Sequence, residues 1–210
     1  PPSGSQPASM QGDLNSAARL LQLLQDRSGL DEAKPMLMRE LAEREAAYGE
    51  AHPDTLLSVT CLAMLLQAQG ELAAAKPLYE RALKGFEAKY GPSHRDTLIS
   101  VNNLAVLLKA MGMLSAAKPL YMRVLKGDKE QLGPSHPHTL DSIYNLARLY
   151  QAEGDIAQAL PLFREELQGC AQLYGAEHQE TKTSARNLRQ LLLEIGSSEE
   201  AAKISEQFGV

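Results

Sequence analysis

Residues 94–125, HRDTLISVNNLAVLLKAMGMLSAAKPLYMRVL, decide the fold, because the chain repeats this stretch with small changes on both sides. A spacing of 42 residues relates the copies, as four series show: His52, His94, His136 and His178; Gly49, Gly91, Gly133 and Gly175; Thr55, Thr97, Thr139 and Thr181; Pro35, Pro77, Pro119 and Pro161. A period of this length is typical of solenoids in which one supersecondary unit stacks on the next. We therefore predict one elongated domain made of such units.

Apolar residues within each copy recur at the i, i+3, i+4 spacing of amphipathic helices. In the central copy, Val101, Leu104 and Leu108 form the stripe of one helix, and Ala117 and Tyr121 belong to the stripe of a second. We predict five antiparallel helix pairs, at about 13–48, 55–90, 97–132, 139–174 and 181–207. The residues 1–12 are rich in Pro, Ser and Gly, and we expect a disordered linker or an expression remnant there.

Glycine and proline mark the helix ends in each copy. Gly70 and its counterparts suit the left-handed position that ends the first helix of a pair. Before the next pair, Ser93, Asp96 and Thr97 all qualify as the N-cap. Pro77 and its counterparts lie inside the second helices, where proline removes a hydrogen bond. We expect a loosened first turn or a shallow bend there.

Composition excludes several classes of partner. The formal net charge is −5 and no run of Lys and Arg occurs, so nucleic acid is not expected as a partner. No apolar run reaches the length that a membrane span needs, and we expect no membrane insertion. Cys61 and Cys170 lie in different repeats without CxxC spacing. We predict that both are buried or half-buried thiols of a protein in a reducing compartment.

Catalysis and metal binding have little support in the sequence. The phosphate-binding motifs GxxxxGK[ST] and GxGxxG are missing, as are the GxSxG and HExxH motifs of hydrolases. We predict no enzyme activity, no catalytic residue and no cofactor. Packed helices lie about 8–10 Å apart, so the four periodic histidines cannot converge on one ion with bonds of about 2 Å. We predict that they make hydrogen bonds that fix the loops between repeats.

The pattern HxxTLxSVxNLAxLLxAxGxLxxAKPLYxRxL, followed by YGPSH, resembles the tetratricopeptide repeat (TPR) in the 42-residue form of kinesin light chains and nephrocystin-3-type proteins. The resemblance covers about residues 13–207. It implies an all-α, right-handed TPR solenoid whose first helices line a concave groove that binds extended peptides. In kinesin light chains, an Asn before the Leu-Ala pair contacts the peptide backbone. Asn103, Asn145 and Asn187 stand at that place here, whereas Arg19 and Cys61 replace it in the first two pairs.

Helical spacing identifies the residues that share a face with these amides. Asn can donate to and accept from a peptide main chain, and Arg and Lys can bind its carboxylates. A polar helix face that is simply solvated is the alternative. The candidate peptide-binding residues are Asn102, Asn103, Lys109, Tyr144, Asn145, Arg148, Arg186 and Asn187.

We therefore predict a non-catalytic interaction module that binds a cargo-adaptor peptide or a disordered tail in its concave groove. The alternative is a structural or self-associating scaffold, or the sensor region of a larger signalling protein. The short last pair would then leave Leu191 and Ile195 under-covered and favour stacking through an open C-terminal end. We expect a cytoplasmic location, and the resemblance to kinesin light chains implies association with the cytoskeleton.

Overall fold

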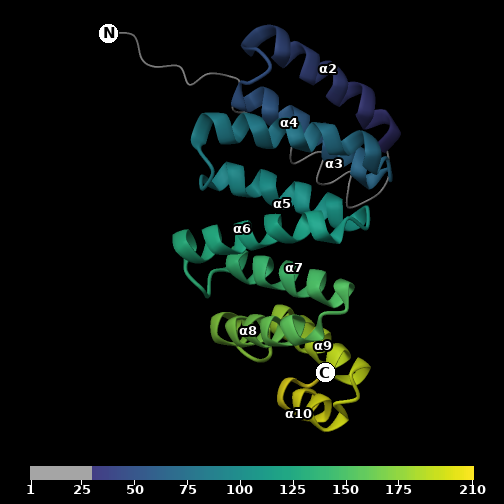
Figure 1. The fold of residues 1–210 in the computed structure, drawn as a ribbon, viewed down its shortest axis with the longest axis vertical. Helices are drawn as coiled ribbons and strands as arrows, with labels where there is room; N and C mark the ends of the chain where they lie inside the picture. Colours follow the sequence, from purple (N-terminus) through teal and green to yellow (C-terminus); the bar gives the residue numbers. More distant parts are fainter. Residues whose placement is uncertain (1–29) are drawn as a thin grey trace. The chain divides into compact units, whose positions relative to one another are not determined.

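In this computed structural model, residues 30–210 are described, with side chains from Ala33 onward, and they form nine α-helices and no strand (Figure 1). The predicted linker 1–12, the first helix of the first pair and Arg19 lie outside the described residues. The helices are α2 (Leu30–Tyr48), α3 (Pro53–Ala68), α4 (Leu72–Tyr90), α5 (Arg95–Ala110), α6 (Leu114–Leu132), α7 (Pro137–Glu153), α8 (Ile156–Tyr174), α9 (Gln179–Glu194) and α10 (Ser198–Phe208).

The sequence pattern predicts second helices over 72–90, 114–132 and 156–174, and α4, α6 and α8 begin and end at these residues, with 19 residues each. The prolines lie inside them, as predicted, while the bend that we expect from them stays a prediction. The first helices α3, α5, α7 and α9 begin two residues earlier than the predicted Thr positions. The starts of the first helices were therefore predicted less well than the bounds of the second helices.

The histidine of each repeat explains the earlier start, because it is the N-cap. His52, His94, His136 and His178 accept a hydrogen bond at Nδ1 from the backbone N–H two residues on, at 3.2–3.3 Å. The predicted caps Ser93, Asp96 and Thr97 are wrong, since His94 takes that role. Thr97 instead donates to the carbonyl of Gly91 at 2.8 Å and closes the loop. The prediction that the histidines fix the loops by hydrogen bonds is confirmed.

The chain divides into two compact units, and the described part of unit 1 comprises residues 30–111. In this unit, α3 packs against α2 and α4, and α4 packs against α5. Small residues let the helices approach closely, since Ala63 of α3 and Ala75 of α4 are fully buried. Gly85 serves the same purpose, because a Cβ there would lie 2.5 Å from Leu56 Cδ1.

Unit 2 comprises residues 112–210 and contains α6 to α10, each packed against the next (Figure 1). Its core repeats the rules of unit 1, with Ala147 of α7 and Ala159 of α8 fully buried and Gly169 pressed against Leu140. The prediction that Leu191 is under-covered is wrong. Leu191 is fully buried, because α10 packs on α9 and buries Ala201 and Phe208.

Candidate functional site

A hydrogen bond between Gln151 and Glu194 shows that the first helices of unit 2 present one common face. Gln151 Nε2 of α7 donates to Glu194 Oε2 of α9 at 3.0 Å. Residues three or four positions earlier on each helix share that face. We call this face the polar strip; it consists of Tyr144, Asn145, Arg148 and Gln151 of α7 and Arg186, Asn187, Gln190 and Glu194 of α9.

Four residues of the polar strip form a hydrogen-bonded network: Arg148, Gln151, Gln190 and Glu194. Arg148 Nη1 donates to Gln151 Oε1 at 2.8 Å, and Gln190 Nε2 donates to Glu194 Oε1 at 3.1 Å. Together with the Gln151–Glu194 bond, these contacts connect the Arg148 guanidinium to the Glu194 carboxylate through one amide. Arg148 is held in place yet stays exposed, so it can still bind a ligand.

The partner of Gln151 depends on a residue of the second helix. In unit 1, the Tyr79 hydroxyl donates to Gln67 Oε1 at 2.9 Å, and Gln67 is the counterpart of Gln151. In unit 2, helix α8 has Phe163 at the position of Tyr79, and Phe163 has no hydroxyl. Tyr144 meets this ring edge-on, with centroids 6.1 Å apart. Gln151 is therefore available to the polar strip.

Asn145 and Asn187 lie at the same repeat position on α7 and α9 and are half-buried. Within residues 30–210, neither side chain has a hydrogen-bond partner in the structure. Each amide therefore has an unoccupied donor and an unoccupied acceptor. Arg186, next to Asn187, is exposed. Five of the eight predicted residues thus lie together: Tyr144, Asn145, Arg148, Arg186 and Asn187.

The other three predicted residues, Asn102, Asn103 and Lys109, lie on α5 in unit 1. The corresponding face there also exposes apolar side chains. Leu57 of α3 is 47% exposed and Ile99 of α5 is 49% exposed, whereas unit 2 has Asp141 and Thr183 at these positions. The sequence alone could have predicted this contrast, through a comparison of residues at equal repeat positions.

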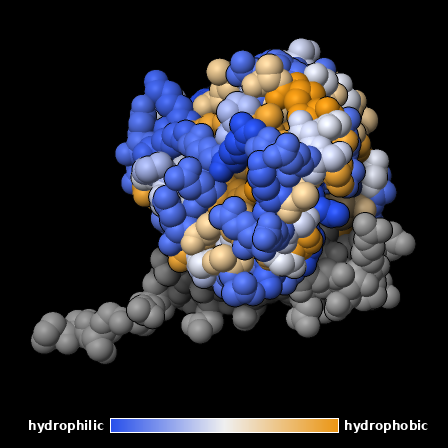
Figure 2. Space-filling model, turned by 90° about the horizontal axis from the view of Figure 1, so that it is seen from below, coloured by the Kyte–Doolittle hydropathy of each residue, from blue (hydrophilic) through white to orange (hydrophobic). Residues whose placement is uncertain are grey.

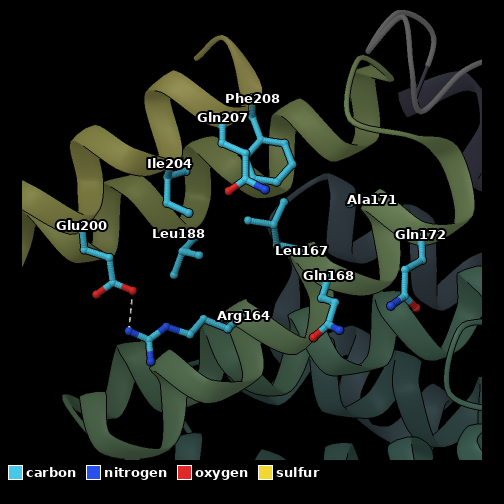
Figure 3. A pocket seen from close by; sticks show the side chains of 10 residues that line it. All are labelled: Arg164, Leu167, Gln168, Ala171, Gln172, Leu188, Glu200, Ile204, Gln207 and Phe208. Atoms are coloured by element: carbon cyan, nitrogen blue, oxygen red, sulfur yellow. Dashed lines mark hydrogen bonds and ion pairs between the residues drawn. The ribbon is translucent and has the colours of Figure 1, made fainter.

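A pocket between α8 and α10 was not predicted (Figure 3). Its volume is about 390 Å³, and Leu167, Leu188, Ile204 and Phe208 line its interior. The Arg164–Glu200 ion pair, drawn as a dashed line, joins the two helices at one side of it. Figure 2 views the molecule from the α10 end and shows hydrophobic surface between polar side chains. α10 has 11 residues and α8 has 19, and the side-chain packing that shapes the pocket between them could not be read from periodicity.

The two cysteines are structural. Cys61 is half-buried and Cys170 is buried, as predicted. Burial raises the pKa of each thiol to about 11, so both stay protonated and poorly nucleophilic near neutral pH. Among the described residues, no group of three or more His, Cys, Asp or Glu side chains is placed to hold a metal ion. Nor does any described helix have the length and apolarity to cross a membrane.

Comparison with known families assigns the chain. The sequence profile of the tetratricopeptide repeat matches residues 56–130, 102–170 and 138–207, which together span most of the chain. This chain belongs to the tetratricopeptide repeat family. Members of this family are generally protein-interaction scaffolds without catalytic activity. No significant match among curated proteins was found.

Solved structures agree with this assignment. Nearly identical TPR-like repeats of a putative kinesin light chain from Podosopora anserina have a TM-score of 0.81 and 26% identity, covering 92% of each chain. BtubC (BKLC) from P. vanneervenii has a TM-score of 0.78 and 20% identity, covering 90% of this chain and 75% of that one. MamA from Desulfovibrio magneticus RS-1 has a TM-score of 0.62 and 14% identity, covering 93% and 92%. The predicted all-α TPR fold of the kinesin light chain type is confirmed.

Proposed function

We propose that this TPR chain binds an extended peptide segment of a partner protein on the polar strip of unit 2. One observation carries the proposal. Asn145 and Asn187 occupy equal positions on neighbouring first helices, and both amides have unoccupied hydrogen-bonding groups. An extended peptide presents main-chain N–H and C=O groups along its length, which an Asn side chain can pair with on both its donor and its acceptor side.

Charged groups of the polar strip would select among peptides. Arg148 and Arg186 are exposed and can bind carboxylates on the ligand. Glu194 lies in the same network and disfavours a second carboxylate beside it. Tyr144 offers a ring edge for apolar contact. The strip therefore suits a peptide with one or two acidic residues and mixed neighbours, bound with micromolar affinity, or about −8 kcal/mol.

Likeness to kinesin light chain repeats makes cargo-adaptor peptides and disordered tails the first ligands to test. The test is selection from a library of tiled disordered peptides on the purified chain, beside an Asn145→Ala, Arg148→Glu variant. We expect the parent to enrich a shared motif that the variant fails to enrich. Equal enrichment by both proteins, or none by the parent, would sink the proposal. A location in the cytoplasm is part of the proposal and is checked with a fluorescent fusion.

Self-association through the α9–α10 end is a second candidate, favoured by the pocket between α8 and α10. Leu193 and Ile195 near this end are 42% and 39% exposed. Light scattering over a wide concentration range tests it, with Ile204→Glu inside the pocket and Ala202→Glu on the exposed side of the same helix. A dimer that only Ile204→Glu abolishes supports this candidate. A monomer at every concentration rules it out.

A further inference from the structure

Buried serines mark the junctions between a second helix and the first helix that follows it. Ser58 of α3, Ser142 of α7 and Ser184 of α9 stand at equal repeat positions, and all are at most 5% exposed. Each lies against a different polar group on the preceding second helix. Comparing the repeats therefore shows how different side chains pair with the same buried serine position.

In unit 1, the buried polar groups between α2 and α3 are paired with a cation, Arg44. Arg44 Nη2 lies 2.8 Å from Glu40 Oε1, and Arg44 Nη1 donates to Ser58 Oγ at 2.7 Å. The Arg44 side chain is only 14% exposed. The Glu40 carboxylate is thus neutralised by a cation on its own helix.

In unit 2, a carboxyl group occupies the α8–α9 junction without such a cation. Glu166 has the repeat position of Glu40, but Cys170 stands where unit 1 has Arg44. Glu166 is 6% exposed, and its Oε1 contacts Ser184 Oγ at 2.5 Å and Cys170 Sγ at 3.5 Å. Its Oε2 is buried and has no hydrogen-bond partner among residues 30–210.

The surroundings of Glu166 favour its neutral form. Burial is the largest influence and raises the pKa of Glu166, while the hydrogen bonds with Ser184 and Cys170 oppose this. The charged groups that act on it from the neighbouring helices, Asp141 of α7 and Glu180 of α9, are both acidic and raise its pKa further. Cys170 supplies no compensating charge, because its thiol is neutral.

We propose that Glu166 makes the α8–α9 junction proton-sensitive, so that the neutral acid keeps the two helices packed and its ionisation loosens α9, together with α10, from α8. An ionised Glu166 would place an uncompensated charge in the core, with Oε2 unable to reach water. Loosening α9 relieves that cost by admitting water. Opening α9 breaks its packing on α8 and the Gln151–Glu194 hydrogen bond to α7, but it leaves the packing of α6 against α7 in place.

The sign of the pH dependence follows from linkage. The native state holds the Glu166 proton to higher pH than the unfolded state, whose carboxyl has the ordinary pKa of 4.5. The unfolded state therefore binds fewer protons, and stability falls as pH rises. The stabilisation by this group is full below the ordinary pKa and is lost as pH rises through the raised native pKa. For each pH unit by which the native pKa exceeds the unfolded pKa, the equilibrium constant for unfolding rises about tenfold across this pH range.

Two measurements on the full chain test the proposal, and the first is direct. Carbon-13 NMR of the side-chain carboxyls follows the titration of Glu166, with Glu166→Gln to assign its signal. We expect a midpoint clearly above the ordinary one, with amide signals of α9 and α10 changing in the same pH range. A midpoint at or below the ordinary value overturns the proposal.

The second measurement is the urea midpoint between about pH 5 and pH 8, a range in which folded proteins are commonly most stable. We expect Glu166→Gln to remove most of the decline with rising pH and to exceed the parent at the upper end. The matched variant Glu40→Gln should lower the midpoint throughout, because it removes the half-buried Arg44–Glu40 ion pair. An unchanged pH slope in Glu166→Gln overturns the proposal, whatever its absolute stability.

Discussion

Units 1 and 2 have the same core at equal repeat positions but differ at several exposed positions of their first helices. Val59 of unit 1 and Ile143 of unit 2 share one repeat position, and both are fully buried. The same holds for Ala63 and Ala147. On the exposed face, by contrast, Leu57 and Ile99 of unit 1 correspond to Asp141 and Thr183 of unit 2. The positions that repeat build the fold, and those that vary give each unit its own surface. Function is therefore best sought where the repeat breaks.

The largest expected effect tests the shared core. Leu65 of α3 and Leu149 of α7 hold one repeat position and are both fully buried. Leu65→Ala and Leu149→Ala each leave a cavity and should reduce the free energy of unfolding by about 2–5 kcal/mol. Urea denaturation measures both. A cost near zero in one unit would show that its core does not follow the common rule.

A smaller effect tests one place where the repeat fails. Thr97 of α5 donates to the Gly91 carbonyl at 2.8 Å, but the hydroxyl of its counterpart Thr181 is buried without a partner among the described residues. Thr97→Val should lower stability by about 1 kcal/mol, since it removes a net favourable hydrogen bond. Thr181→Val should be neutral or slightly stabilising. Equal losses in thermal or urea denaturation would contradict this reading.

Periodicity predicted most of the fold, because a repeated core needs the same small and apolar residues in every copy. The ends of α4, α6 and α8 were predicted to the residue by tyrosine or leucine followed by glycine. The starts of the first helices were not, because a histidine cap is uncommon and Ser93 and Asp96 are better-known caps. The coverage of Leu191 was also predicted wrongly, since it depends on how α10 packs.

The candidate site was only partly predictable. Helical spacing placed Asn145 with Arg148, but it gave no reason to separate them from Asn103 of the other unit. The link between α7 and α9 depends on side-chain lengths at Gln151 and Glu194, which spacing does not describe. Burial of Glu166 was missed for a similar reason. A lone Glu in a charged-looking stretch gives no sign in sequence that a neighbouring helix covers it.

The central claim is that peptide recognition belongs to the polar strip of unit 2, and one titration series tests it most directly. The dissociation constant of a library-selected peptide is measured by calorimetry for the parent, for Asn145→Ala, Arg148→Glu, and for the matched variant Asn103→Ala, Val106→Glu. The last variant places the same residues, Ala and Glu, at the same repeat positions of unit 1. We predict a loss of at least about tenfold, or 1.4 kcal/mol, for the unit 2 variant and less than about threefold for the unit 1 variant. Equal losses, or a larger loss in unit 1, would contradict the account.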